Sequence, residues 1–382
     1  MYKIYTCVIL LWITCMFFSC KQEENKTRTY KVDFEKAKPY DFKSEIDSVH
    51  LIILETSKDH EIGRISKILF SNDKVIVSDV MTHSIYVFNR DGILVTKISY
   101  IGNGPGEYVR IDDVLIDSFA NQIIILDGLQ KKMVTYSMSG EYIKEFVFQS
   151  EQAPMHFAQI NDELYALDYQ RHSRGLSWKY NLIVSSLVPG CNMQKYLPYE
   201  EPLGISFSPR TTLFKLEDTL VYVPQYSPIV YNVFADRLDV RYSFDFGNNW
   251  INEDFERIKW SNAIDFMNAL ENSNFVYYFN LLESKTHIYV EFNYKDKLYH
   301  AIVDKLTGVS KLYRNEEEFN CSFPTTPLAV NGSEFIIPIE AYQVRSLIEE
   351  DVFKNKLKKE NLNDLIRITE DSNPILMFIT FK

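Results

Sequence analysis

A repeat of 48 residues near the start of the chain limits the fold more than any other feature of the sequence. The segment SNDKVIVSDVMTHSIYVFNRDGILVTKI, which begins at Ser71, aligns without a gap with FANQIIILDGLQKKMVTYSMSGEYIKEF, which begins at Phe119. The matched pairs are Val75 with Ile123, Val77 with Ile125, Asp79 with Asp127, Phe88 with Tyr136 and Gly92 with Gly140. A fixed period of about 40 to 50 residues with several short strands per unit is typical of β-propeller blades.

Each unit contains the strands that a blade needs. KVIVSD is a short and almost wholly apolar run, which is typical of a strand with both faces covered. SIYVFN alternates more, and RDG or MSG then supplies a tight turn into ILVTKI or EYIKEF. The remaining strand comes from the segment before each unit, RISKILF or IDDVLID. We expect this strand to line a central channel.

Four further segments of the same kind follow, so the sequence predicts six blades. They are DELYALD at Asp162, DTLVYVP at Asp218, THIYVEF at Thr286 and SEFIIPI at Ser333. The body, residues 45–382, has no Pro/Gly/Ser linker and is expected to be one domain. Helical patterns over 251–270 and 341–369 predict insertions. The fold class is therefore all-β, a six-bladed β-propeller with helical insertions.

The two ends of the chain are expected to close the ring. The sixth unit supplies SEFIIPI and the C-terminal NPILMFITF, which leaves it short of a strand. The unassigned apolar segment SVHLIILET, from Ser48, can fill that place. We therefore expect it to pair with Ile375–Phe381, so that no long sheet edge stays exposed.

The first twenty residues predict secretion and a lipid anchor. Lys3 is the only charge before an apolar run from Cys7 to Phe18, so residues 1–19 are expected to be a signal peptide. The run is too short to span a bilayer, which takes roughly twenty residues. Phe17-Phe18-Ser19-Cys20 resembles a lipobox, with Cys20 as the lipidation site. Two or three acyl chains on Cys20 would hold the protein at a membrane.

Residues 20–44 are expected to form the tether. Its start, Lys21-Gln22-Glu23-Glu24-Asn25, resembles the signals that send lipoproteins to the outer face of the bacterial outer membrane, although a solvated linker would have the same composition. The net charge of −11 repels phosphate backbones, so nucleic acid is not expected as a partner. Cys191 and Cys321 also remain after cleavage. They form one disulfide or stay as two buried thiols.

Several of these marks together carry a resemblance to a known family. They are the Gly-Pro-Gly-Glu-Tyr motif at Gly104, the aspartates Asp79, Asp127 and Asp168 at strand ends, the YVFNRDG turn, LIILETS from Leu51 and the closing NPILMFITF. The chain resembles the six-bladed β-propeller lipoproteins, which are relatives of NHL-repeat propellers. The likeness is strong over residues 48–148 and at the C-terminus, and weak over 150–330. It implies a fold and a location but no catalytic residues.

Two sets of carboxylates are candidates for chemistry. Asp79 and Asp127 could be acid/base groups or metal ligands, but equivalent positions in adjacent blades lie far apart. A short acceptor at a strand end commonly holds backbone N–H groups, and this interpretation is favoured. Asp112 and Asp113 are adjacent on an expected inner strand, with side chains on opposite faces. One of the two could reach the channel and bind a cation or sugar, or form a solvated wall, which we favour.

No motif of a hydrolase, a metal site or a nucleotide site survives inspection. HExxH, GxSxG and GxxxxGK[ST] are all missing, so we assign no catalytic residue, metal or cofactor. The glycine-rich YIGNGPGEY precedes a strand rather than a helix, so its glycines are expected to shape the crossing between blades. His156 and His172 are interpreted as core or surface histidines. Trp178, Trp250 and Trp260 could stack on sugars or pack between blades.

The leading hypothesis for function is a binding or assembly module. The propeller would be lipid-anchored and would offer its loops and channel mouth to a glycan, a peptide or an envelope protein. The alternative is an enzyme, a polysaccharide or peptide hydrolase or lyase with catalytic groups on scattered loops. An enzyme should show converging titratable groups with perturbed environments. A sensory ectodomain is a third hypothesis, but it would require a transmembrane helix.

Overall fold

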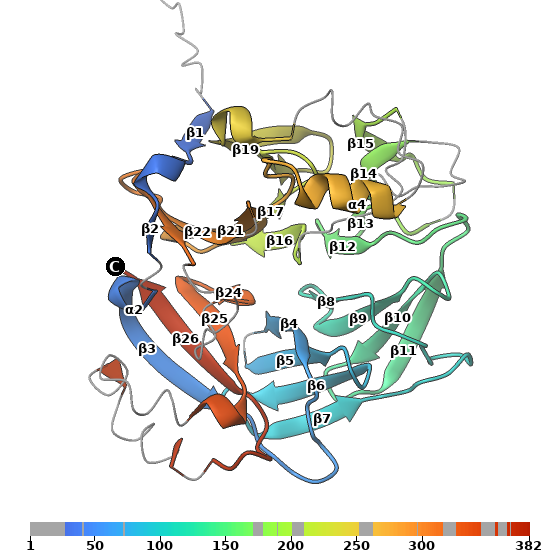
Figure 1. Cartoon of the computed structure of the whole chain (residues 1–382). Helices are drawn as coiled ribbons and strands as arrows, with labels where there is room; N and C mark the ends of the chain where they lie inside the picture. The colour runs from blue at the N-terminus through green and yellow to red at the C-terminus, as the bar shows by residue number, and fades with distance from the viewer. Residues whose placement is uncertain are drawn as a thin grey trace, which may run out of the picture.

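The computed structural model places six β-sheets of four or five strands around a ring, as Figure 1 shows. The description covers residues 27–39, 42–71, 73–170, 179–188, 190–200, 210–251, 263–295, 297–315, 326–344, 356–357, 365–366 and 368–382. The expected six-bladed β-propeller is therefore confirmed. The expected signal peptide, residues 1–19, and the expected lipidation site Cys20 lie outside the described residues.

The first two blades are built on the same ladder. Blade 1 contains β4 (Ile65–Phe70), β5 (Lys74–Asp79), β6 (Ser84–Asn89) and β7 (Leu94–Ile98), and blade 2 contains β8 (Asp113–Asp117), β9 (Gln122–Asp127), β10 (Lys132–Ser137) and β11 (Tyr142–Val147). Val75 lies opposite Phe88 in blade 1. Ile123 lies opposite Tyr136 in blade 2. The 48-residue offset is thus a true structural equivalence.

Blades 3 to 6 follow in chain order. Blade 3 contains β12 (His156–Gln159), β13 (Leu164–Asp168), β14 (Tyr180–Ser186) and β15 (Gln194–Pro198), and blade 4 contains β16 (Leu213–Leu216), β17 (Thr219–Tyr222), β18 (Ile229–Val233) and β19 (Leu238–Asp245). Blade 5 contains β20 (Asn280–Glu283), β21 (His287–Tyr294), β22 (Lys297–Asp304) and β23 (Ser310–Arg314). Blade 6 contains β24 (Ala329–Asn331), β25 (Glu334–Ile339), β26 (Ile375–Phe381) and β3 (Ile46–Ile53). The four degenerate segments expected as blade strands are β13, β17, β21 and β25.

The ends of the chain close the ring as expected. β3 is the outer strand of blade 6 and runs antiparallel to β26. Leu51 lies opposite Met377, and Ile53 lies opposite Ile375. Met377 and Ile375 are fully buried. β3, the first strand within the expected body of residues 45–382, therefore belongs to the last blade.

The segment before β3 clasps the outside of the ring, which corrects the expected tether. β1 (Arg28–Lys31) adds to β19 as a parallel fifth strand of blade 4, and β2 (Lys38–Pro39) adds to β23 of blade 5. Figure 1 shows this blue segment passing from β19 to α2 (Phe42–Glu45) and β3. Tyr30 is buried against blade 4. Part of residues 20–44 thus lies in the sheets of the propeller.

The core lies between neighbouring blades, and this explains the apolar runs in the second strands. Ile76 belongs to the same cluster as Val134 of blade 2. Its neighbour Val77 belongs to the same cluster as Phe378 of blade 6. Successive side chains of a strand point to opposite faces, and both faces of each sheet are covered here. A strand buried on both sides therefore needs apolar residues at consecutive positions.

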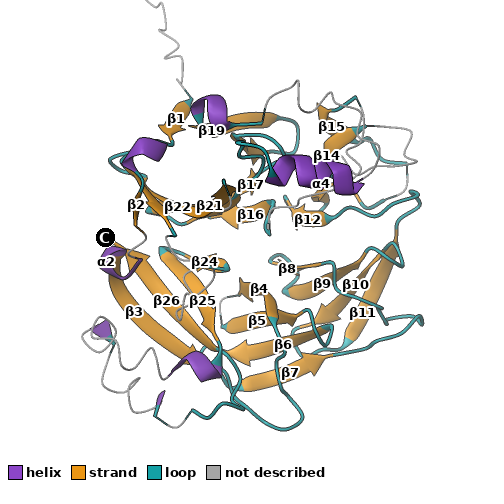
Figure 2. Ribbon diagram, viewed as in Figure 1, coloured by secondary structure: helices purple, strands orange, loops and turns teal. Residues whose placement is uncertain are grey.

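Helices, drawn in purple in Figure 2, are few in the described part of the chain. α4 (Ala263–Glu271) confirms a helix within the first insertion and buries Phe266 and Leu270 against Ile251. Short turns occur at Phe34–Lys36, Gly247–Asn249 and Ala341–Gln343. Most of the second expected helical stretch, 341–369, lies outside the described residues. Among the residues described, none of the helices has the length and apolarity that crossing a membrane takes.

The two faces of the ring differ in their loops. The connection from β7 to β8, residues 99–112, lies on what we call the crossover face, and the turns at 71–73 and 118–121 lie on the opposite, hairpin face. Gly106 has a φ of 72°, so this glycine supplies the backbone angle expected of the loop. A Cβ at Gly102 would meet the carboxylate end of the Glu107 side chain at 2.1 Å, so that side chain would have to move.

Candidate functional site

Asp79, which ends the second strand of blade 1, fixes the backbone around it. Its carboxylate accepts hydrogen bonds from three backbone N–H groups and one hydroxyl. The donors are Gly63 N at 2.8 Å, Arg64 N at 3.0 Å, Met81 N at 2.8 Å and Thr82 Oγ1 at 2.8 Å. Burial acts to raise the pKa of Asp79, but these hydrogen bonds outweigh it and the pKa is lowered. The structural interpretation is therefore confirmed at this position.

The equivalent aspartates of the next two blades make similar local bonds. Asp127 accepts from Val109 N at 2.7 Å and from Gln130 N at 3.0 Å. Asp168 is wholly buried, and burial raises its pKa. Its carboxylate accepts a 2.9 Å hydrogen bond from the hydroxyl of Tyr222 in blade 4. The three aspartates belong to three separate sheets, so each acts within its own blade junction.

Asp112 is the last residue of the connection before β8, and Asp113 is the first residue of that strand, so only one of the two lies on the expected inner strand. Asp112 faces a cleft on the crossover face and accepts from Gly128 N at 2.6 Å. Asp113 is buried and forms a 2.6 Å ion pair with Lys67 Nζ. Burial acts to raise the pKa of Asp113, but Lys67 and His156 outweigh it and the pKa is strongly lowered. The group that lines the channel here is the cation Lys67 rather than a carboxylate.

His156 joins this ion pair from the first strand of blade 3. Its Nδ1 lies 3.5 Å from Asp113 Oδ2, and its side chain is 17% exposed. It also lines the crossover-face cleft, about 660 Å³ in volume, together with Arg110, Asp112 and Arg210. Lys67, Asp113 and His156, which belong to blades 1, 2 and 3, therefore converge here. Neither here nor elsewhere in the described part of the chain do three His, Cys, Asp or Glu side chains gather as metal ligands would.

The central channel is a cavity of about 690 Å³. All six first strands contribute to its wall, so the expected role of these strands is confirmed. Apolar residues such as Leu115 and Ala329 form much of the wall. The charged lining residues are Lys67, Arg90, Lys215, Lys285, Glu217 and Glu283. Cations therefore outnumber carboxylates along the channel, although the protein as a whole is acidic.

Two of these cations have no carboxylate partner among the described residues. Lys285 forms an ion pair with Glu217 at 3.1 Å, and Lys67 forms one with Asp113. Arg90 instead lies over the ring of Phe70, 5.1 Å from its centroid, and its guanidinium donates to the carbonyl of Ser71.

Lys215, on the first strand of blade 4, lies over the ring of Phe119 at 5.4 Å. Phe119 is 59% exposed, in the turn between the first two strands of blade 2. Burial lowers the pKa of Lys215. Both unpaired cations thus stand beside an aromatic ring, and both line the channel.

Sequence reasoning missed these two cations. Arg90 lies in the NRDG turn, where a charged residue is ordinary, and Lys215 lies in a region where the repeat has faded. The available signal was the position of Lys215 just before DTLVYVP, since the strand expected to line the channel precedes each unit. The charge excess itself depends on which cations find a carboxylate, and that is decided by contacts between blades.

Of the candidate tryptophans, His172 and the two cysteines of the body, the structure describes Trp250 and Cys191. Trp250 packs against Phe246 with ring centroids 5.1 Å apart and also against Phe279, so packing rather than sugar stacking accounts for it. Trp178, Trp260 and His172 lie outside the described residues. Cys191 is exposed in the turn after β14, and Cys321 lies outside the described residues, so their pairing stays a prediction.

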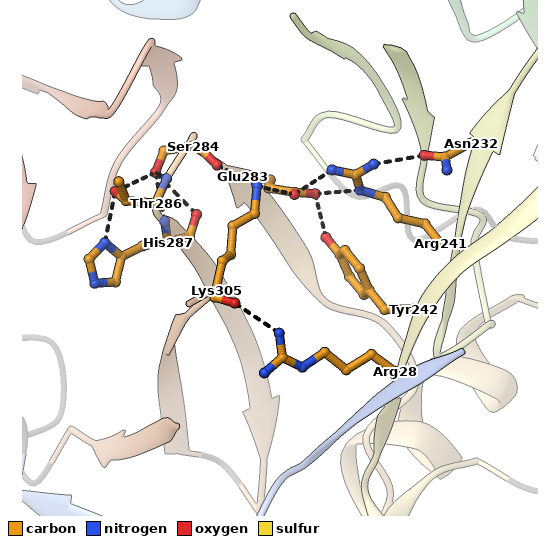
Figure 3. A network of polar contacts seen from close by, with 9 residues as sticks. All are labelled: Arg28, Asn232, Arg241, Tyr242, Glu283, Ser284, Thr286, His287 and Lys305. Atoms are coloured by element: carbon orange, nitrogen blue, oxygen red, sulfur yellow. Dashed lines mark hydrogen bonds and ion pairs between the residues drawn. The ribbon is translucent and has the colours of Figure 1, made fainter. Parts of the chain in front are cut away.

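A buried carboxylate joins blades 4 and 5, and Figure 3 shows the contacts around it. Glu283, at the end of β20, has a fully buried side chain. Arg241 binds it through Nε at 2.9 Å and Nη2 at 2.6 Å. Tyr242 donates to it at 2.7 Å, and Lys305 Nζ lies 2.7 Å away. Burial acts to raise the pKa of Glu283, but these cations outweigh it and the pKa is lowered.

Comparisons with known proteins agree with this architecture. A family model described as a 6-bladed beta-propeller matches residues 21–338. Among solved structures, a Bacteroides fragilis protein described as exported shares 17% identity, with a TM-score of 0.78 over 93% of this chain and 99% of that one. A member of the DUF4221 family from Bacteroides vulgatus shares 13% identity, with a TM-score of 0.52 over 88% and 99%. No curated protein matches the chain.

Proposed function

Because the chain belongs to the family of six-bladed β-propellers whose model it matches, we propose that it is an extracytoplasmic binding module anchored by lipid on Cys20. Its ligand site is the central channel, and the ligand is an acidic oligosaccharide. The signal-like N-terminus and the lipobox-like Phe17-Phe18-Ser19-Cys20 support the location. One of the structural neighbours is also described as exported.

The observation that carries the proposal is the pair of unpaired cations in the channel. Arg90 and Lys215 each stand beside an aromatic ring and form no ion pair with a described carboxylate. Arg90 is half-buried and Lys215 is exposed, so an anionic ligand can reach both charges and supply the partner that each lacks. The aromatic rings can stack on sugar faces, and the amides of Asn121 and Asn331, which also line the channel, can bond to hydroxyls.

Calorimetric titration tests the proposal. The mature chain with Cys20→Ala is titrated with oligosaccharides that contain uronic acid and with neutral ones of the same length. We expect binding of the acidic ligand and a loss of about tenfold in affinity for Lys215→Met, because one charge-assisted hydrogen bond contributes about 1.5–3 kcal/mol. Lys285→Met is the matched control, since Glu217 already neutralises that cation.

Two results would count against this function. One is an equal loss of affinity for Lys215→Met and Lys285→Met, which would mean that the charge of Lys215 has no special role. The other is binding of acidic peptides with no binding of acidic saccharides, which would assign the channel to a different class of ligand.

The enzyme alternative has one observation in its favour. Asp113, held ionised by Lys67, lies beside His156 at the edge of the crossover-face cleft. A carboxylate next to an imidazole nitrogen can orient the ring for general base catalysis. Incubating the chain with polysaccharides and peptides and measuring product release decides the matter. An enzyme should lose activity in His156→Gln and keep it in His60→Gln, a histidine that contacts Ser57 away from the cleft.

A further inference from the structure

A second cleft lies where blades 4 and 5 meet the N-terminal strand β1. It has a volume of about 400 Å³. Its lining residues include Arg28, Tyr30, Arg241, Glu283 and Lys305. Glu283 also lines the central channel, so it stands in the wall between the two cavities. The cleft therefore has different cations from those of the channel.

Among the described residues, the cleft is lined by three cations and one carboxylate. Glu283 is fully buried and is shared by Arg241 and Lys305. Arg28 donates from Nη1 to the carbonyl oxygen of Lys305 at 2.8 Å and lies over the ring of Tyr30. Within the described residues, Arg28 forms no ion pair. A local excess of two positive charges therefore remains in a protein whose net charge is −11.

Unused donors remain at the open side of the cleft. The side chains of Arg241 and Lys305 are 19% and 24% exposed, whereas that of Glu283 is fully covered. Arg241 uses Nε and Nη2 for Glu283 and Nη1 for Asn232 at 2.9 Å, which leaves one N–H on each terminal nitrogen. Figure 3 shows Arg28 at the backbone end of Lys305, whereas Arg241 lies at the Glu283 carboxylate that the other end of Lys305 contacts. The buried carboxylate of Glu283 thus holds Arg241 and Lys305 in place, while their remaining N–H donors stay available to a ligand.

We propose that this cleft binds a phosphate group. A phosphate carries a charge of about −1 to −2 near neutral pH and several acceptor oxygens, which matches the local charge excess and the separate donors. Guanidinium groups bind such oxygens in a planar, two-donor geometry. The fully buried Glu283 supplies the rigidity that a preformed site needs. The group would come from a lipid headgroup or from a soluble phosphate compound.

The position of the cleft makes a lipid headgroup reachable. This step rests on the proposed lipid attachment at Cys20. Arg28 begins β1 and is eight residues after Cys20. Since an extended chain advances at most about 3.3–3.6 Å per residue, the cleft lies within about 30 Å of the acylated end. Headgroup phosphates of the membrane that holds the anchor are therefore within the reach of the cleft.

Two binding assays on the mature chain with Cys20→Ala test the site without the lipid. One measures co-sedimentation with phosphatidylcholine vesicles that contain or lack phosphatidic acid, and the other titrates inorganic phosphate by calorimetry. We expect Arg28→Ala to weaken binding about tenfold, because it removes one charge-assisted contact. Arg237→Ala is the matched control. Arg237 also belongs to blade 4, but Asp236 and Asp239 neutralise it at 3.3 and 3.0 Å.

The outcomes separate the sources of the phosphate. Binding to phosphatidic acid vesicles that Arg28→Ala weakens and inorganic phosphate displaces supports a lipid headgroup. Binding of inorganic phosphate alone, with the same dependence on Arg28, supports a soluble phosphate compound. No binding in either assay, or an equal effect of Arg28→Ala and Arg237→Ala, overturns the site. Neither Arg28 nor Arg237 lines the central channel, so failure here leaves the saccharide assay unaffected.

Discussion

Met377, in the last strand of the chain, lies directly opposite Leu51, in the outer strand of the same sheet. The two residues are more than 300 positions apart in sequence, so this single ladder holds the beginning and the end of the propeller together. Met377 is fully buried, and it shares a cluster with Phe335 and Tyr289 of blades 6 and 5. The closing strand is therefore part of the core between blades 5 and 6.

We expect Met377→Ala to destabilise the fold by about 2–5 kcal/mol, the usual cost of emptying a large buried side chain. Deletion of residues 375–382 should leave the protein unfolded or aggregated, because net stabilities are only about 5–15 kcal/mol. Thr380→Ala is the control on the same strand, where the side chain contacts Ser48 at the surface. Urea denaturation measures the difference. An unchanged midpoint for Met377→Ala would mean that this strand is not part of the cooperative unit.

The repeat made the architecture predictable where the sequence is regular. The second strands of blades 1 and 2, β5 and β9, both end in an aspartate and recur with a spacing of 48 residues. Both strands are apolar because each blade must bury both faces of its sheet. Ring closure was predictable for a related reason. One strand lacked a partner at each end of the chain, and a single pairing satisfied both ends.

The course of residues 28–39 and the charge of the channel could not be predicted in the same way. RTYK is polar and short, and its place beside β19 depends on Tyr30 entering the cluster around Phe244. Likewise, no feature of the sequence near Glu283 indicates that Arg241, 42 residues away, neutralises it. Such pairings depend on how neighbouring blades pack, and no local pattern encodes that packing.

His300 should make the stability depend on pH. It is fully buried on β22, and its Nδ1 lies 2.6 Å from the hydroxyl of Tyr289. Burial lowers the pKa of His300 from 6.5 to about 4. The folded state therefore binds fewer protons than the unfolded state between these values, so stability is lost as the pH falls from about 6.5 to 4.

The expected loss over that interval is about 3 kcal/mol at most, at about 1.36 kcal/mol for each pH unit. His300→Gln should flatten this part of the profile, although it also lowers stability at pH 7. His60→Gln should leave the slope as it is. The measurement is the free energy of unfolding in urea at half-unit steps of pH. A parent and a His300→Gln variant with parallel profiles would assign the pH dependence to other groups.

Cys20→Ala should release the protein from the membrane. If Cys20 carries the acyl chains, its loss removes several methylene chains, each buried CH₂ contributing about 0.8 kcal/mol. Mass spectrometry of the N-terminal peptide and fractionation of cells measure lipidation and location. Cys191→Ala, which changes an exposed thiol in the propeller, is the control and should stay bound. A Cys20→Ala protein that remains in the membrane fraction in high salt would contradict the anchor.

Glu283→Gln should be among the most damaging single changes in the propeller. The side chain is fully buried and accepts from Arg241, Tyr242 and Lys305. Loss of its charge leaves two cations between blades 4 and 5 without their counter-ion. Removing one partner of a buried ion pair costs about 3–5 kcal/mol, because the remaining charge is uncompensated.

The matched control for this prediction is Glu217→Gln. Glu217 also pairs with a lysine, Lys285, but the two side chains are 64% and 54% exposed, so its loss should cost less than about 1 kcal/mol. Urea denaturation at pH 7 compares both variants with the parent. The folded pKa of Glu283 is lowered, so its contribution exists above the unfolded value near 4.5 and is lost as the pH falls below it. The gap between Glu283→Gln and the parent should therefore narrow in acid. Equal costs for the two substitutions at pH 7 would show that burial gives the Glu283 network no special weight.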